Sequence, residues 1–320
     1  MPKLLILGSS GFVGKSLISE LESNDFYDIY APRSGPTTVY KEQPNLVAYH
    51  DLVWDVRRKS DLVPNFDLII HAATPASALM NTMEPEAMRH VIVQGMENVI
   101  EFASRHSVSP KILFTSSGAV YGEVPSSIDY ISEDFPVGSE SPGDSSAYAE
   151  GKRRAEIILR DATAEGLCNG IITRLFAFSG THLPRDRHFA IGNFVESAVT
   201  KKKITVRSDG SSIRSYLDEQ DMAQWLLAIA EDGVPGQIYH IGSERAISVR
   251  ELAFLVSERY EILTGISIPV EILGQVSQLD GVSRYVPSTL RTRTELGLSE
   301  TITLESSIDK MLETAIAAQS

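Results

Sequence analysis

The stretch that decides the fold is Lys3-Leu-Leu-Ile-Leu-Gly-Ser-Ser-Gly-Phe-Val-Gly14, which continues into Lys15-Ser-Leu-Ile-Ser-Glu-Leu21. An apolar run of strand length leads into three glycines spaced G-x-x-G-x-x-G, and an amphipathic segment follows them. A strand, a glycine-rich turn and a helix in this order predict the first unit of a dinucleotide-binding fold. We expect a pyrophosphate group at the N-terminus of that helix.

Apolar runs and amphipathic segments alternate through the first half of the chain. The strand-like runs are 4–7, 28–31, 46–49, 67–71, 111–115 and 170–174, and the helix-like segments are 14–22, 85–106 and 148–164. This alternation predicts an α/β fold of Rossmann type, in which helices cover both faces of a doubly wound parallel sheet. After residue 174 the pattern loosens into loops, followed by a helix-like segment at 221–231 and a strand-like run at 237–241.

We therefore expect two domains. Residues 1–176 are predicted to form an NAD(P)-binding Rossmann domain, to which residues 214–242 return. Residues 177–320 are predicted to form mainly a smaller C-terminal α/β domain that binds the substrate.

The charge and composition of the chain exclude several classes of partner. The 320 residues include 42 acidic and 29 basic side chains, which give a formal net charge of −13. Nucleic acids and anionic membranes need a basic face, so neither is expected as a partner, and an anionic substrate must be held by local arginines. No apolar run approaches a membrane span, no secretory leader is recognisable, and the single cysteine, Cys168, cannot form an intramolecular disulfide. We expect a cytoplasmic protein, and no cluster of side chains has the spacing of a metal site.

The second strand-like run bears on the choice between NAD and NADP. An acidic residue at its C-terminal end would hold the ribose 2′-hydroxyl of NAD, whereas an arginine suits the 2′-phosphate of NADP. Asp28 stands at the start of the run and Arg33 stands where the acid is expected, which favours NADP; if Arg33 is only a loop residue, NAD remains possible. Further on, Asp55, followed by Val56, is expected either to accept a hydrogen bond from the adenine amino group or to cap a helix.

Candidate catalytic residues occur in two segments of the sequence. Thr115-Ser-Ser117 follows the strand-like run 111–115, at the edge of the sheet where open α/β folds bind ligands. Tyr148 and Lys152 are four residues apart and share one helical face. A tyrosine titrates near ~10 in water, so as a base it needs its anion stabilised, which a neighbouring ammonium group does. A hydroxyl from Ser117 could bind the same substrate oxygen as Tyr148. Together, Ser117, Tyr148 and Lys152 are typical of enzymes that pass a proton to or from a carbonyl or alcohol while a nearby cofactor transfers a hydride.

These motifs occur in the order and spacing of a known family. They are Gly8-x-x-Gly11-x-x-Gly14, His71-Ala-Ala73, Thr115-Ser-Ser117 with Val120-Tyr-Gly122, Tyr148-x-x-x-Lys152, Arg174-Leu-Phe, Asp209 to Asp218, His240-Ile-Gly-Ser243 and Arg284 to Ser288. By these motifs the chain resembles the extended short-chain dehydrogenase/reductases that modify nucleotide sugars. The resemblance extends over essentially the whole sequence.

The resemblance implies roles for particular residues. The implied catalytic residues are Ser117, Tyr148 and Lys152. The implied cofactor-binding residues are Gly8, Ser10, Gly11, Phe12, Val13, Gly14, Arg33, Asp55, Val56, Ala72, Ala73, Tyr148 and Lys152. The implied substrate-binding residues are Ser117, Gly118, Tyr148, His188, Asn193, Arg214 and Arg284, of which the two arginines would hold a diphosphate. A structural role in its loop is the alternative for His188, as it is for His182. The resemblance also implies a homodimer formed through the helices after Pro85 and Tyr148.

Departures from the family pattern reduce the number of reaction types that we expect. Gly118 and Ala119 stand where the similar 4,6-dehydratases carry an Asp-Glu pair, so dehydration is not expected. Ile92 and Ala177 replace two asparagines common in the family, which makes substrate placement less transferable than catalysis. We predict an enzyme that acts at C4 of a nucleotide-diphosphate sugar, reducing a 4-keto-6-deoxy-hexose with NADPH and using Tyr148 as the proton donor. The alternatives are an NAD-dependent nucleotide-sugar 4-epimerase and a non-catalytic NADP-binding regulator.

Overall fold

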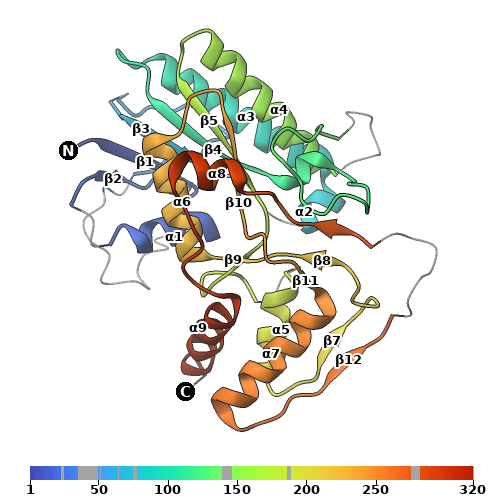
Figure 1. Ribbon diagram of the computed structural model, residues 1–320. Coiled ribbons are helices and arrows are strands. Elements are labelled where there is room, and N and C mark those ends of the chain that lie inside the picture. Colours follow the sequence, from blue (N-terminus) through green and yellow to red (C-terminus); the bar gives the residue numbers. More distant parts are fainter. Residues whose placement is uncertain are drawn as a thin grey trace. The chain divides into compact units, whose positions relative to one another are not determined.

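The computed structural model describes residues 1–22, 25–34, 50, 52–63, 65–74, 78–138, 146–185, 189–274 and 282–319 (Figure 1). It divides into two compact units. The first contains Met1–Gly122, Asp134–Leu175 and Ala223–His240, and the second contains Glu123–Glu133, Phe176–Met222 and Ile241–Ser320. The segment that returns to the first unit is thus shorter than the expected 214–242, and residues 123–133 group with the second unit.

A six-stranded sheet forms the centre of the first unit. Its strands are β1 (Lys3–Leu7), β2 (Asp28–Tyr30), β3 (Leu68–His71), β4 (Lys111–Ser117), β5 (Asn169–Leu175) and β10 (Ile238–Ile241). Their order is β10-β5-β4-β3-β1-β2, and β1 pairs in parallel with both β2 and β3, as β4 does with β3 and β5. The predicted doubly wound parallel sheet is confirmed, and its order reverses at β1, where such sheets bind ligands. The run expected at 46–49 lies outside the described residues.

Helices cover both faces of this sheet because its side chains alternate between them. On one face, Leu5, Ile69 and Phe114 belong to a buried apolar cluster with residues of α3 (Pro85–Ser104) and α4 (Ala147–Ala164). These two helices lie side by side (Figure 1). The other helical elements of the first unit are α1 (Phe12–Glu20), α2 (Ala78–Met83), the short 3-10 helix η2 (Gly118–Tyr121) and most of α6 (Glu219–Asp232).

The described part of the second unit combines short strands with helices. The strands are β6 (Phe178–Ser179), β7 (Ile204–Val206), β8 (Ile213–Arg214), β9 (Leu217–Asp218), β11 (Ile247–Ser248), β12 (Val270–Ile272) and β13 (Arg284–Tyr285). The helices are α5 (Ala190–Val199), α7 (Val249–Thr264), α8 (Leu290–Leu296) and α9 (Leu304–Ala317). The strands form a three-stranded sheet of order β11-β8-β13 and two strand pairs, β12-β7 and β6-β9. None of the helices in the described parts of the chain has the length and apolarity needed to cross a membrane.

The turn between β1 and α1 is built on close backbone contacts. Gly8 has a φ of +88°, which favours glycine, and a Cβ there would lie 2.5 Å from the carbonyl of Ala72. A Cβ on Gly14 would lie 2.3 Å from the carbonyl oxygen of Gly8. The glycine spacing therefore allows α1 to start against the end of β1, which places its N-terminus at the reversal point of the sheet.

This packing predicts opposite effects for two alanine substitutions at buried helical glycines. Gly14→Ala forces the turn apart and should lower the free energy of unfolding by about 1 to 3 kcal/mol. Gly95→Ala in α3 should raise it by about 0.5 to 1 kcal/mol, because its Cβ would meet Val56 at an ordinary 3.4 Å and alanine favours helix. Urea unfolding measures both values, and a Gly14→Ala protein as stable as the wild type would contradict the packing argument.

Candidate functional site

The N-terminus of α1 is open to a ligand. Gly11 is its N-cap residue and adopts an extended conformation with no side-chain cap, while its own N–H donates to the carbonyl of Gly8 at 3.0 Å. Ser10 and Gly11 are exposed, and Phe12 and Val13 are partly exposed. Gly14 is buried beneath the turn. Backbone N–H groups at a helix start, with no side chain over the glycines, fit a phosphate group.

Ala72 and Ala73 extend the same edge from the neighbouring strand. Both follow β3 and are partly exposed, and the N–H of Ala72 donates to the carbonyl of Leu7 at 2.9 Å. This hydrogen bond holds the segment after β3 against the glycine turn, as the close approach of Gly8 requires.

The residues expected near the adenosine half of a cofactor lie beyond β2. The backbone of Arg33 exchanges hydrogen bonds with the segment 52–54, at 2.8 Å to the carbonyl of Leu52 and 2.9 Å from the N–H of Trp54. The carboxylate of Asp55 accepts from Arg57 at 2.6 Å, and this hydrogen bond lowers the pKa of Asp55. Asp55 closes a turn rather than capping a helix, while Val56 is buried and its carbonyl accepts from Asn98.

The predicted catalytic residues come together in the first unit. β4 ends at Ser117, whose Oγ caps η2 by accepting from the N–H of Ala119 at 3.2 Å. Tyr148 lies in the first turn of α4, and its N–H donates to the Oδ1 of Asn81 at 2.8 Å. A hydrogen bond joins the side chains of Ser117 and Tyr148. Gly118, expected at the substrate, is the buried first residue of η2.

Lys152 is buried one turn after Tyr148. Its Nζ donates to the Oγ1 of Thr74 at 2.7 Å and to the carbonyl of Thr115 at 2.6 Å, and lies 5.5 Å from the centroid of the Tyr148 ring. Burial lowers the pKa of Lys152 to about 7, although Glu156 opposes this shift. Thr74 and Asn81 could not be identified from the sequence, because neither belongs to a motif and their contacts arise only when distant segments fold together.

The electrostatics around Tyr148 differ from the expectation based on its spacing from Lys152. Burial raises the pKa of Tyr148 to about 12, and the hydrogen bond with Ser117 only partly opposes the rise. The phenol is therefore neutral at physiological pH. A neutral phenol beside a second hydroxyl is suited to donate a proton to a carbonyl oxygen.

Two predicted arginines lie on neighbouring strands of the second unit. In the parallel pairing of β8 and β13, Arg284 is opposite Ile213 and Tyr285 is opposite Arg214. Because successive side chains alternate, Arg214 and Arg284 leave this sheet on opposite faces. Accordingly, the guanidinium of Arg214 lies 5.9 Å from the ring centroid of Tyr285, whereas Arg284 donates to the carbonyl of Asp129 at 2.6 Å.

The remaining substrate candidates are spread over the second unit. Asn193 is exposed on α5. His188 lies outside the described residues. His182 is 3.1 Å from Glu219, a carboxylate that also accepts from the backbone and hydroxyl of Thr181. This arrangement agrees with the structural alternative for His182.

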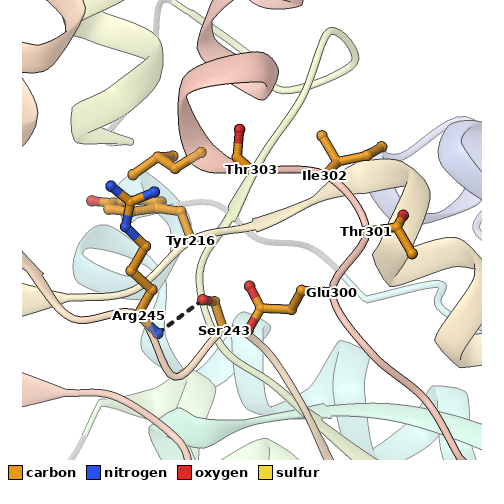
Figure 2. Close-up of a pocket in the computed structure, with 8 residues that line it drawn as sticks. Tyr216, Ser243, Arg245, Glu300, Thr301, Ile302 and Thr303 are labelled. Atoms are coloured by element: carbon orange, nitrogen blue, oxygen red, sulfur yellow. Dashed lines mark hydrogen bonds between the residues drawn. The ribbon is translucent and has the colours of Figure 1, made fainter.

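A cavity of about 150 Å³ in the second unit contains none of the predicted residues (Figure 2). It is lined by Tyr216, Ser243, Arg245, Glu300, Thr301, Ile302, Thr303 and Leu304. The carboxyl group of Glu300 is directed towards Ser243, and burial raises its pKa. Within the described ranges, no group of His, Cys, Asp or Glu side chains is arranged to hold a metal ion.

Comparison with known proteins gives consistent matches. The model of the NAD dependent epimerase/dehydratase family matches residues 4–242. UDP-glucuronic acid decarboxylase 6 of Arabidopsis thaliana is 28% identical over 262 residues, covering 80% of this chain and 74% of that protein. The structure of UDP-glucose 4-epimerase from Thermotoga maritima with UDP-glucose aligns with a TM-score of 0.84 at 18% identity, covering 99% of this chain and 100% of that one. RMD from Pseudomonas aeruginosa, complexed with NADPH, aligns with a TM-score of 0.81 at 20% identity and the same coverage.

The burial of Lys152 predicts a pH-dependent effect on stability. The folded protein releases the proton of Lys152 near pH 7, whereas an unfolded chain releases it near the ordinary value of 10.5. Between these values the unfolded chain binds more protons, so the contribution of this group to stability rises with pH. Burial lowers the pKa of the neighbouring His71 to about 3, so His71 stays neutral over this interval.

Lys152→Met removes this titration. The difference in unfolding free energy between the wild type and the variant should therefore shift in favour of the wild type as the pH rises from 6.5 to 9. Urea unfolding at both pH values measures the difference, and a difference that does not change with pH would show that the lysine titrates normally in the folded protein.

Proposed function

Because the chain belongs to the NAD dependent epimerase/dehydratase family, we propose that it acts at C4 of a nucleotide-diphosphate sugar and reduces a 4-keto-6-deoxy-hexose with NADPH. The observation that carries this proposal is the partly buried phenol of Tyr148, which is hydrogen-bonded to Ser117 and whose raised pKa keeps it neutral. Reduction of a ketone needs a proton donor at the carbonyl oxygen, and this pair supplies one.

The first unit suits a nicotinamide dinucleotide. Its glycine turn leaves backbone N–H groups for a pyrophosphate at the start of α1, and Gly8 and Gly14 allow the close backbone packing of that turn. Ala72 and Ala73 line the next edge, and Asp55 and Val56 are assigned to the adenine. When bound, the cofactor supplies the hydride.

Side chains of the protein supply the proton that the reduction also needs. Ser117 donates a hydrogen bond to the carbonyl oxygen of the sugar, and Tyr148 transfers its phenolic proton to that oxygen as the alcohol forms. The resulting tyrosinate is stabilised by the ammonium of Lys152, whose Nζ is fixed by Thr74 and by the Thr115 carbonyl. Gly118, the buried first residue of η2, is assigned to the substrate because it adjoins Ser117.

The nucleotide-sugar substrate is supported by the relatives, whose names refer to UDP-glucuronic acid and UDP-glucose. Arg214 is our first choice for the diphosphate, because guanidinium groups bind such oxygens bidentately. Arg284 leaves the other face of its sheet, so we assign it a supporting role. Asn193 and His188 complete the proposed substrate set, and we propose a homodimer formed through α3 and α4.

A 4-epimerase is the second candidate. Gly118 and Ala119 leave no carboxyl group directly after Ser117 for the removal of water, and these small residues agree with an epimerase as well as with a reductase. An epimerase must first take a proton from the sugar hydroxyl and therefore needs Tyr148 as the anion. Arg33, which suits the 2′-phosphate of NADP, favours reduction over epimerisation, because a reductase exchanges NADPH in each turnover.

Tyr148→Phe tests the proposed proton donor. With NADPH and a panel of nucleotide-linked 4-keto-6-deoxy sugars, the wild type should consume NADPH in proportion to the keto sugar, and the variant should lose kcat by about a hundredfold or more. NADPH binding, followed by its fluorescence, should be retained and serves as the control. If the wild type instead converts a nucleotide hexose without net consumption of NADPH, it is an epimerase.

Arg33→Ala tests the assignment of the cofactor. Loss of a charged hydrogen bond to the 2′-phosphate should weaken NADPH binding by about tenfold or more and leave NADH binding unchanged. Arg160→Ala, which removes an exposed cation from α4, is the control for a general change of charge. Titration with both nucleotides distinguishes the cases, and equal weakening of the two would place Arg33 away from the 2′-phosphate.

A further inference from the structure

A chain of buried polar side chains adjoins the proposed catalytic residues within the first unit. Glu156, one turn after Lys152 on α4, accepts from the Oγ of Ser116 at 2.5 Å and from Arg174 at 3.0 and 2.7 Å. Each of these three residues is at most 5% exposed. The carboxylate thus joins α4 to the last residues of β4 and β5.

The chain continues from Arg174 to the last strand of the sheet. The Nη1 of Arg174 donates to the hydroxyl of Tyr121 at 2.7 Å, and this hydroxyl lies 2.6 Å from the Nε2 of His240. The hydroxyl of Tyr121 thus accepts from Arg174 and is also hydrogen-bonded to the ring of His240. Tyr121 and His240 are both buried.

The members of this network stand where the chain leaves the first unit. It passes into the second unit after Gly122, after Leu175 and after His240. Tyr121 and Arg174 each precede one of these points by a single residue, and His240 is itself the third. One hydroxyl, that of Tyr121, therefore connects all three exits.

We propose that Tyr121 is a positioning residue, which holds η2 and the end of β4 so that Ser117 keeps its geometry while three segments leave the sheet. The effect of Tyr121 on catalysis, through Ser117, rests on the proposed function. The hydroxyl is suited to this role because the hydrogen bond from the Arg174 guanidinium is charge-assisted and buried. Tyr121 itself does not touch the substrate in this scheme. It acts through η2, the turn that follows Ser117 directly.

Tyr121→Phe tests the proposal, since it removes one oxygen and leaves the Arg174–Glu156 ion pair in place. Tyr27→Phe is the matched control, because the hydroxyl of Tyr27 also donates a hydrogen bond to a charged partner in the first unit, the partly buried one to Glu231 at 2.7 Å. The first readout is hydrogen exchange of the amides of Ala119, Gly122 and Phe176, which bond to Ser117, Ala119 and Ile241. Exchange at these amides should be about tenfold faster in Tyr121→Phe and unchanged in Tyr27→Phe.

The second readout separates positioning from general stability. In the NADPH assay, Tyr121→Phe should lower kcat by about tenfold or more with KM within about twofold, whereas Tyr27→Phe should keep both values. Unchanged exchange at the three amides in Tyr121→Phe, or equal effects of the two variants, would overturn the proposal. If the wild type reduces no keto sugar, the proposed function fails, while the exchange comparison still decides whether Tyr121 holds these segments.

Discussion

The site depends on one buried carboxylate, that of Glu156. Two cations are buried near it: Arg174, bound directly at 2.7 Å, and Lys152, one helical turn away. Buried charges are stable only when paired and hydrogen-bonded, and removing one partner of such a pair costs about 3 to 5 kcal/mol. Glu156 therefore allows β5 to carry an arginine one residue before its end and α4 to carry a lysine into the interior. The lysine does not form an ion pair with it, and this partial compensation leaves the pKa of Lys152 lowered.

The parallel sheet explains why these groups meet. β3, β4 and β5 run in the same direction and are paired in register, so their carboxyl ends, at His71, Ser117 and Leu175, lie along one edge. α4 crosses back over the sheet with its N-terminal turns at this edge. The lysine, the phenol and the serine are therefore brought together by backbone geometry that apolar packing fixes. The polar contacts among them then select particular rotamers.

Much of the first unit could be predicted from the sequence, because its signals are local. The glycine turn, the alternation of strands and helices, and the spacing of Tyr148 and Lys152 all depend on residues near one another in the chain. Thr74 and Asn81 could not be predicted, since a threonine or asparagine in a loop has no spacing that marks its distant partner. The boundary of the second unit was also less predictable. Its strands are two or three residues long, too short for a periodic pattern to emerge.

The orientations of Arg214 and Arg284 also could not be predicted from the sequence. Arg214 and Arg284 match a family motif one by one, but the face that each side chain occupies depends on the register between β8 and β13. That register joins residues about seventy positions apart. A shift of one residue would bring both side chains to the same face. A motif therefore identifies the residue type, and only the pairing of the strands determines which ligand atom it can reach.

The pKa values of Tyr148 and Lys152 are best considered as a pair. At neutral pH the phenol holds its proton and the lysine is close to half-protonated, so the interior carries less than one full positive charge from the two groups. When Tyr148 gives up its proton, the new negative charge lies on a ring whose centroid is 5.5 Å from the lysine nitrogen, and this charge raises the pKa of Lys152. The lysine then takes up a proton as the tyrosine loses one. Burial, which makes the tyrosinate costly in isolation, thus also makes the lysine responsive to it, and proton uptake by the lysine offsets part of the negative charge that forms on Tyr148.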